Sequence, residues 1–362
     1  MKDINYLFFE LVRVAISVQE TFTRPPSIEE WMQLYNMVKK QSLVGICFAG
    51  VQQLPDTMRP PEMLYLKWMG MAAKIQQRNE VVNRQCVELS KRLKAEGYSY
   101  AILKGQGVGQ LYAEHLHGLR QSGDIDVLMW KDGLTQKENR EEVVKYAKSI
   151  DCNAHDAEHH IAMEMFPNTE VEMHFCPSYL CNPFANKRMQ KWFYDYDKSQ
   201  FVETKLGFCM PDAEYNLVFM LSHTFRHYMS EGVGLRQLMD YYFILRTLQV
   251  RGERLEVTEL LNSLNMLKFA GAVMWVMKEV FGMSEQFMIC EPNERLGKKL
   301  LAHIMQGGNF GHHNNKTIAN KKSHWGRFVN QVAQDLILAK DYPCEALWAP
   351  LSMIREFVRI RT

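Results

Sequence analysis

The sequence predicts an α+β protein in which a small mixed sheet lies between an N-terminal and a C-terminal helical region. Apolar residues recur at helical spacing before about residue 95 and again from Asp212 onward. Between these regions lie short apolar runs with an alternating pattern, which is typical of strands. Their order, strand, helix, strand, helix and hairpin, is that of an α+β fold. We therefore expect three regions, 1–95, 96–205 and 206–362.

Two helix boundaries are evident in the N-terminal region. Ser27, followed by acidic residues, gives a capped helix start, because its hydroxyl accepts a hydrogen bond from a backbone N–H of the first turn. Pro60 and Pro61 mark the next boundary. A helix from Met63 to about Glu96 would span about 50 Å at 1.5 Å per residue. That length bridges the N-terminal region and the predicted sheet.

The middle region contains the predicted strands. The expected strands are Tyr98–Leu103, Asp124–Trp130, Ala157–Phe166 and Glu170–Phe175. Lys104 and Gly105 end the first strand, and a helix is expected from Gln106 to Glu114. Thr135 caps a charged helix that runs to about Ser149. The last two strands are expected to pair as a hairpin.

The C-terminal region is expected to be helical. Asp212 caps its first helix, and Gly232 and Gly234 break that helix. Further helices are expected at Leu235–Val250, 254–282, 292–306 and 323–340. The segment from Gly307 to Lys322 is rich in Gly, Asn and His, and it is expected to be a mobile loop.

Composition limits the class of protein. The chain has 362 residues, 47% apolar and 23% charged, as in globular proteins. A net charge of +2 argues against long nucleic acid as a partner. No uncharged apolar run reaches about 18 residues and no basic segment precedes the first apolar run, so we expect neither a membrane span nor a signal peptide. The eight cysteines form no Cys-x-x-Cys pair, which favours reduced thiols and a cytoplasmic location.

The most informative motif is a pair of aspartates on the second predicted strand. Because side chains alternate along a strand, Asp124 and Asp126 are expected to share a face, while Ile125 and Val127 point to the other. Adjacent carboxylates repel, and a divalent cation between them relieves the repulsion. Mg²⁺ takes oxygen ligands and joins one or two carboxylates to substrate phosphates. The motif therefore indicates nucleotide chemistry, with a solvated turn as the alternative.

A third carboxylate lies on the last predicted strand. Glu172 is a candidate to join the aspartates if the two strands are neighbours. The alternative is an exposed position on an antiparallel strand. Glu170 lies two residues earlier on the same face and is the rival.

Several motifs between about residues 95 and 245 follow one another in a recognisable order: Ile102–Gly105, Leu111-Tyr112, Arg120, Gly123–Leu128, His159-His160, Val171–His174 and Gly234–Asp240. This order resembles the nucleotidyltransferase superfamily of the DNA polymerase β type, and more narrowly the bacterial uncharacterised nucleotidyltransferase family. In that superfamily paired aspartates bind two metals and a third acidic residue completes the site. The resemblance implies a nucleotidyltransferase core. It also implies that Asp124, Asp126 and Glu172 are catalytic residues and metal ligands, with Mg²⁺ or Mn²⁺ as the cofactor.

Residues beside the first two strands are candidates for binding phosphate. Lys104 adds positive charge, and Gly105 permits close backbone approach and opens a helix whose N-terminal amides attract anions. The alternative is an ordinary strand-to-helix turn. The superfamily commonly has Gly-Ser here, whereas this chain has Gly105-Gln106, so Arg120 or Ser122 would take over phosphate contacts. The alternative for Arg120 is a salt bridge to a nearby acid.

Histidines provide the remaining candidates. His155, His159 and His160, with two acids between them, suggest a metal cluster. Adjacent histidines on a strand point to opposite faces, however, so only one reaches a given site. We assign His160 to the nucleotide pocket, with His159 and a solvated edge as alternatives. His174 shares the face of Glu172 and is assigned to the same pocket, with a packed structural histidine as the alternative.

On the first C-terminal helix, His223 and His227 lie one turn apart and share a face. We expect them and Arg236 to face the nucleotide. Arg236 lies on the next helix, and its alternative role is an ion pair with Asp240, four residues later on that same helix.

The sequence therefore predicts a metal-dependent nucleotidyltransferase that moves a nucleoside monophosphate from an NTP to an acceptor hydroxyl. The acceptor is a small molecule, a protein or an RNA end, and the sequence does not select among them. It also leaves the preferred NTP, a general base and the oligomeric state open. The alternative function is a non-catalytic nucleotide-binding or interaction protein with a degenerate core.

Overall fold

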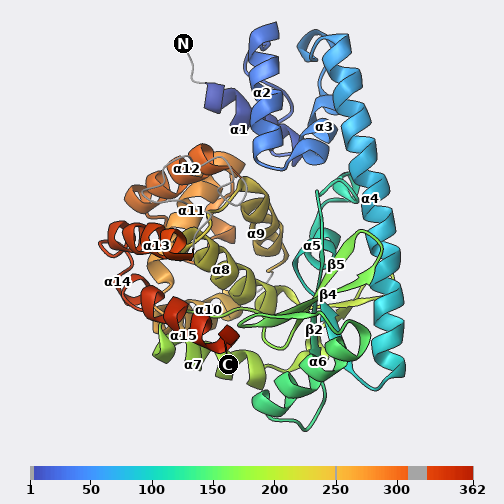
Figure 1. Ribbon diagram of the computed structural model, residues 1–362. Helices are drawn as coiled ribbons and strands as arrows, with labels where there is room; N and C mark the ends of the chain where they lie inside the picture. The colour runs from blue at the N-terminus through green and yellow to red at the C-terminus, as the bar shows by residue number, and fades with distance from the viewer. Residues whose placement is uncertain (1–3, 249–250, 309–323, 362) are drawn as a thin grey trace.

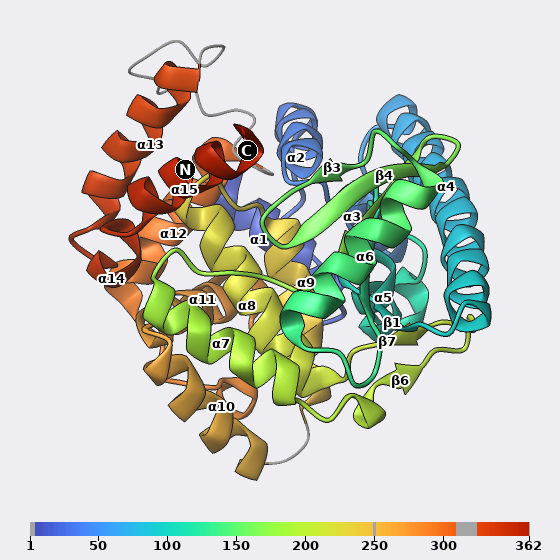
Figure 2. The same ribbon diagram turned by 60° about the horizontal axis from the view of Figure 1, so that its bottom comes forward.

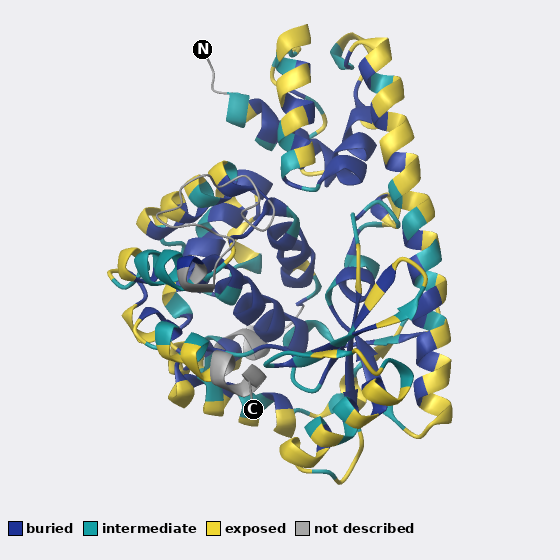
Figure 3. Ribbon diagram, viewed as in Figure 1, coloured by how far each residue is buried: buried dark blue, intermediate teal, exposed yellow. Residues whose placement is uncertain are grey.

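The computed structural model describes residues 4–248, 251–308 and 324–361. Its N-terminal part contains α1 (Ile4–Ala15), α2 (Ile28–Lys40), α3 (Val44–Gln53) and α4 (Glu62–Ala95). Ser27 caps α2 as predicted, and its hydroxyl accepts a hydrogen bond from the backbone N–H of Glu30. Helix α4 runs from these helices along the sheet (Figure 1). Its outer side is exposed and its inner side is buried (Figure 3).

The central sheet has five strands in the order β1-β2-β5-β4-β3. The strands are β1 (Ser99–Ile102), β2 (Ile125–Trp130), β3 (His155–Asp156), β4 (His160–Phe166) and β5 (Thr169–His174). Strands β2 and β5 are parallel, and the other neighbours are antiparallel. Strands β4 and β5 form the predicted hairpin. The predicted class, a small mixed sheet flanked by helices, is confirmed.

The two faces of the sheet have different neighbours. Ile125, Val127 and Met129 of β2 belong to a buried cluster with α4 and α6 (Gln136–Ile150). Because side chains alternate, Asp126 and Leu128 point to the opposite face. There Asp126 lines a cavity together with residues of α8 (Ala213–Met229) and α9 (Leu235–Thr247). Figure 2 shows α6 across the sheet and the C-terminal helices beside it. One face of the sheet is thus core, and the other carries the chemistry.

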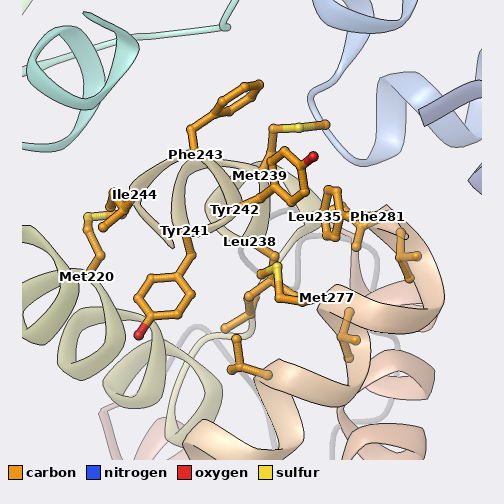
Figure 4. Packing of buried hydrophobic residues seen from close by; sticks show 14 of the residues in the cluster. Met220, Leu235, Leu238, Met239, Tyr241, Tyr242, Phe243, Ile244, Met277 and Phe281 are labelled. Atoms are coloured by element: carbon orange, nitrogen blue, oxygen red, sulfur yellow. The ribbon is translucent and has the colours of Figure 1, made fainter. Parts of the chain in front are cut away.

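The C-terminal part is helical. Besides α8 and α9 it contains α10 (Arg251–Ser263), α11 (Leu267–Phe281), α12 (Glu294–Gly307), α13 (His324–Leu338), α14 (Pro343–Ala346) and α15 (Ala349–Arg361). Helix α9 lies between two of these helices, with Met220 of α8 beside Ile244 on one side and Met277 and Phe281 of α11 on the other (Figure 4). The same buried cluster extends into α1 to α4. The two helical regions therefore share one hydrophobic core.

Several elements differ from the sequence-based expectations, among them β3, α14 and α15, which were not expected. The helix expected from Gln106 to Glu114 is only α5 (Lys104–Val108), followed by single turns of 3₁₀-helix at Gly109–Leu111 and Glu114–Leu116. Gly105 and Gly107 interrupt helical propensity here. Helix α7 (Pro183–Asp195) was not expected, although Asn182 as its N-cap and Pro183 in its first turn are start signals.

Two connecting segments remain, one between α7 and α8 and one after α12. A short hairpin of β6 (Val202–Glu203) and β7 (Cys209–Met210) leads from α7 to α8. The segment expected to be a mobile loop, Gly307 to Lys322, lies outside the described residues except for its first two positions. None of the helices in the described ranges has the length and apolar character needed to cross a membrane.

The turn that carries Lys104 depends on Gly107. A Cβ atom at this position would lie 2.2 Å from the carbonyl oxygen of Ile102, which is backbone and does not yield as a side chain would. We expect Gly107→Ala to lower the free energy of unfolding by about 1–3 kcal/mol. Gly70 is the matched control, because it lies in exposed helix with nothing near its Cβ position.

Gly70→Ala is expected to raise the free energy of unfolding by about 0.5–1 kcal/mol. Urea denaturation followed by circular dichroism measures both variants. Equal stability of Gly107→Ala and the wild type would contradict the assigned close approach between α5 and β1.

Candidate active site

Two carboxylates meet on the face of the sheet opposite α4 and α6. The parallel register pairs Asp126 of β2 with Glu172 of β5, and Leu128 with His174. Directly paired residues on adjacent strands stand on the same face, so Asp126, Glu172 and His174 come together. Asp126 is 4% exposed and His174 is fully buried.

Two basic side chains contact the carboxylates. The Nζ atom of Lys104 lies 2.5 Å from Oδ1 of Asp126 and 3.8 Å from Oε2 of Glu172. The Nε2 atom of His174 lies 2.9 Å from the same Asp126 oxygen and 3.4 Å from Glu172 Oε2. Buried charges are tolerated when they are paired and hydrogen-bonded. The ammonium and the imidazole therefore compensate a pair of carboxylates that would otherwise repel each other.

These contacts shift the protonation equilibria of the group. Burial alone would lower the pKa of Lys104, but the charges of Asp126, Glu172 and Asp124 raise it above its ordinary value. Burial also opposes the charged form of His174, and the hydrogen bonds to the two carboxylates raise its pKa. Burial would raise the pKa of Glu172, yet His174 and Lys104 bring it well below its usual range. Lys104 and His174 thus stabilise the charged form of Glu172.

The backbone places Lys104 at this position by an uncommon conformation. The residue has a φ of 35°, which lies in the left-handed region that non-glycine residues rarely adopt. It follows Leu103, whose N–H still donates to the carbonyl oxygen of Asp126 at 2.8 Å. The chain turns sharply after this last sheet hydrogen bond. Such strained positions cluster at functional sites.

Asp124 differs from the expectation that it shares the strand with Asp126. Strand β2 begins at Ile125, so Asp124 precedes it in a bend, and its side chain is exposed. It lines the same cavity as Asp126. The group of potential metal ligands contains Asp126, Glu172 and His174. A second negative charge buried beside Asp126 would be costly at low dielectric. Asp124 therefore stays in contact with water outside the strand.

A cavity of about 750 Å³ opens over the carboxylates. This size is within the range of small-molecule sites. Most of the predicted site residues line it: Lys104, Gly105, Arg120, Asp124, Asp126, His160, Glu172, His223, His227 and Arg236. Two predicted residues, Ser122 and His174, do not line the cavity. Ser122 accepts a hydrogen bond from Arg120, and His174 lies beneath Asp126 and Glu172.

Arg120 takes the salt bridge that was its alternative. Its Nε and Nη2 atoms each donate to an oxygen of Asp240 on α9, both at 2.6 Å. The hydroxyl of Tyr112 donates to the same carboxylate at 2.7 Å. Only Nη1 points elsewhere, to Ser122 Oγ at 3.0 Å. Arg120 thus fastens α9 to the segment before β2, and its role as a phosphate clamp stays a prediction.

Arg236 adds a second guanidinium close to Arg120. Its Nη1 atom donates to the carbonyl oxygen of Gln121 at 2.7 Å. Burial and the like charge of Arg120 lower the pKa of Arg236 to about 10. An anion in the cavity would relieve this repulsion.

The expected anion site at the start of a helix after Gly105 is not supported. Helix α5 has only five residues, and Gly105 within it has non-helical dihedral angles. A helix this short has little dipole to offer an anion. The cationic side chains of the cavity are therefore the better candidates for binding phosphate.

The histidines form two groups around the cavity. His223 and His227 of α8 have ring centroids 4.4 Å apart, and both are buried. Burial followed by the charge of Arg226 lowers the pKa of His227 to about 4. His159 and His160 lie with ring centroids 4.5 Å apart. The expectation that they point to opposite faces is wrong, because β4 begins at His160 and strand alternation does not extend to His159.

Sequence reasoning did not assign site roles to Asp240 and Tyr112. Asp240 is 120 residues from its partner Arg120 and 128 residues from its partner Tyr112. No local spacing identifies a contact of that kind. The only signal was the presence of both residues in motifs that carried the family resemblance.

Comparisons with known proteins show which family the sequence matches. Residues 27–282 match the protein family described as uncharacterised nucleotidyltransferase. No curated protein matches the chain. Among solved structures, the crystal structure of an antigenic nucleotidyltransferase-like protein from Paracoccidioides brasiliensis is similar, with 12% identity and a TM-score of 0.35 over 59% of this chain and 95% of that chain.

The ion pair of Lys104 gives a stability prediction. Lys104→Met leaves the buried Asp126 and the half-buried Glu172 with imidazole partners alone, so we expect a loss of about 3–5 kcal/mol in unfolding free energy without metal. A divalent cation would then meet no ammonium competitor, so MnCl₂ should raise the melting temperature of the variant more than that of the wild type. Lys131→Met removes a pair between an exposed lysine and the partly exposed Glu142, and it is the control. Equal Mn²⁺-dependent shifts in all three proteins would contradict this prediction.

His227 gives a pH prediction. Its folded pKa of about 4 lies below the ordinary value of 6.5, so between these values the unfolded chain binds a proton that the folded chain does not. Stability is therefore lost as pH falls from about 6.5 towards 4. We expect the decrease in unfolding free energy between pH 7 and 5 to be about 1–2 kcal/mol smaller in His227→Gln. Urea titrations at both pH values measure it, and an unchanged decrease would refute it. His155→Gln removes an exposed imidazole and serves as the control.

Proposed function

The chain belongs to the family of uncharacterised nucleotidyltransferases, and from this premise we propose that it transfers a nucleoside monophosphate from an NTP to a hydroxyl group of an acceptor. The observation that carries the proposal is the direct pairing of Asp126 and Glu172 on parallel strands beneath a cavity. A purely structural sheet gains nothing from carboxylates at two paired, largely buried positions. We also keep the division into regions 1–95, 96–205 and 206–362 as a proposal.

The transfer proposed here is a displacement at phosphorus. The acceptor oxygen bonds to the α-phosphorus, the bond from that phosphorus to the oxygen bridging to the β-phosphate breaks, and pyrophosphate leaves with the electron pair. The acceptor hydroxyl loses its proton either to Glu172, which lines the cavity, or to water with no protein base. Catalysis of this kind rests on positioning and on compensating negative charge.

The donor set fits a divalent ion. Ligand atoms of Asp126, Glu172 and His174 lie within 4.8 Å of one another, and two of the three are carboxylate oxygens. We propose that Asp126 and Glu172 hold the ion, with Asp124 approaching from the rim, and that Mg²⁺ or Mn²⁺ is the cofactor. When bound, such an ion neutralises developing charge on the phosphoryl oxygens and lowers the pKa of an attacking hydroxyl.

The cationic residues of the cavity are assigned to the triphosphate. Lys104 is the closest cation to the carboxylates. Once an ion compensates the carboxylates, its ammonium would exchange Asp126 for a phosphate oxygen as its partner. Arg236 lies on the α9 wall and carries a charge that Arg120 destabilises. Its guanidinium would bind phosphate oxygens through parallel hydrogen bonds. His160, His223 and His227 line the same space and remain candidates for contacts with the nucleotide.

A second candidate function has one observation in its favour. Lys104 and His174 already compensate Asp126 and Glu172, so the fold requires no ion for charge balance. A protein that binds a nucleotide without transferring it would keep this arrangement. The two candidates differ in whether a product carries the α-phosphate of the NTP.

The decisive test incubates the purified protein with α-labelled NTPs, Mg²⁺ or Mn²⁺, and a cell extract, and identifies what gains label. We expect labelling by the wild type and a loss of roughly a hundredfold or more in Asp126→Asn and Glu172→Gln. Glu170→Gln tests the rival carboxylate, since Glu170 lies two residues earlier on β5, is exposed and lines the same cavity, and we expect it to keep activity. NTP binding without any labelled product would favour the second candidate.

A further inference from the structure

We propose that the ion at this site is held by imidazole nitrogen as well as carboxylate oxygen, so that the protein selects Mn²⁺, Co²⁺ or Zn²⁺ over Mg²⁺. The inference rests on the proposed function for the position of the ion, and it deepens that function by naming the class of metal. It assigns His160 and His174 to the metal rather than to the nucleotide. His159 is the third imidazole of the group.

The potential ligand atoms form one compact cluster. His174 Nε2 lies 2.9 Å from Asp126 Oδ1 and 3.4 Å from Glu172 Oε2. His160 Nδ1 lies 3.8 Å from the same Glu172 oxygen. His160 Nδ1 and His159 Nε2 are 3.3 Å apart. Two triads, one of three histidines and one of Asp126, Glu172 and His174, each lie within 4.8 Å and share His174.

These separations are those expected around one ion. Ligand bonds to nitrogen and oxygen of about 2.0–2.2 Å place neighbouring ligand atoms roughly 3–3.5 Å apart in tetrahedral or octahedral geometry. Three of the four measured separations are 2.9, 3.3 and 3.4 Å, and the fourth is 3.8 Å. Small rotations of the partly exposed His160 are enough to adjust the longest one.

Two carboxylates, completed by water and substrate phosphates, also suit Mg²⁺, so the oxygen donors alone do not separate it from other ions. Mg²⁺ requires close to six oxygen ligands in octahedral geometry and binds nitrogen poorly. The cluster offers only Asp126 and Glu172 as carboxylates, because Asp124 is exposed and outside the triads. Imidazole nitrogen suits manganese-to-zinc metals of the first transition row. The donor set thus favours these ions.

The surroundings keep the imidazoles directed at the cluster. His159 and His174 are 4% and 0% exposed, and the Nδ1 atom of each has no hydrogen-bond partner in the described structure. Their Nε2 atoms are the ones that meet the other members of the cluster. Lys104 approaches the carboxylates from the cavity and opposes any cation. The imidazole nitrogens add ligand bonds to the metal, and these bonds would allow it to displace the Lys104 ammonium.

The test uses the full chain with MnCl₂ or MgCl₂ alone. We expect Mn²⁺ to bind at least about tenfold more tightly than Mg²⁺. Pulsed electron paramagnetic resonance of bound Mn²⁺ should show coupling to ¹⁴N from coordinated imidazole. His160→Gln should weaken Mn²⁺ binding about 10–100-fold, change Mg²⁺ binding by less than about twofold, and reduce the ¹⁴N signal. His155→Gln is the matched control, because His155 lies nearby on β3 but is exposed.

Bound Mn²⁺ without ¹⁴N coupling, equal affinities for Mn²⁺ and Mg²⁺, or no binding of Mn²⁺ would each overturn the inference. His159→Gln gives a second variant if His160→Gln does not fold, and the wild-type spectrum needs no variant. Failure of the proposed function looks different. In that case Mn²⁺ binds with ¹⁴N coupling, but no product carries label from the NTP.

Discussion

Two carboxylates at paired positions of a sheet interior set the main constraint on this protein. The parallel register brings Asp126 and Glu172 together, and burial makes their mutual repulsion and loss of hydration costly. Lys104 and His174 satisfy that constraint. Lys104 reaches the carboxylates only through a left-handed backbone conformation, and the adjacent turn needs Gly107 to pass close to Ile102. Local strain is therefore balanced by electrostatic stabilisation of the site.

A second buried ion pair gives the cavity its helical wall. Asp240 on α9 accepts two hydrogen bonds from Arg120 and one from Tyr112. The ring of Tyr112 also stacks on Phe243 of the same helix, with centroids 4.2 Å apart. Breaking such a pair leaves an uncompensated charge in the interior, so α9 is fixed strongly relative to β2. Arg236, on the same helix, owes its place in the cavity wall to this attachment.

The sequence was sufficient for features that depend on local patterns. Alternation identified the strands and the inward face of Ile125 and Val127, and the cap at Ser27 placed a helix start. Alternation failed at Asp124 and His159, where the strand stops one residue short and the backbone is free to turn. Local patterns could not predict partners that are distant in the sequence, such as Asp240, which binds Arg120 from 120 residues away. The compensation of Asp126 by Lys104 likewise depends on the sheet register and a strained turn, which no spacing encodes.

The segment that matches the family, residues 27–282, runs from just before α2 to the end of α11 and so includes every element that lines the cavity. The C-terminal helices lie beyond it, yet they contact the site region. Arg355 of α15 pairs with Glu158, the residue before His159, at 2.5 Å. On α13, Gln331 donates to the carbonyl oxygen of Met229 at the end of α8. Helices outside the family segment therefore contact both the residue before His159 and the end of α8.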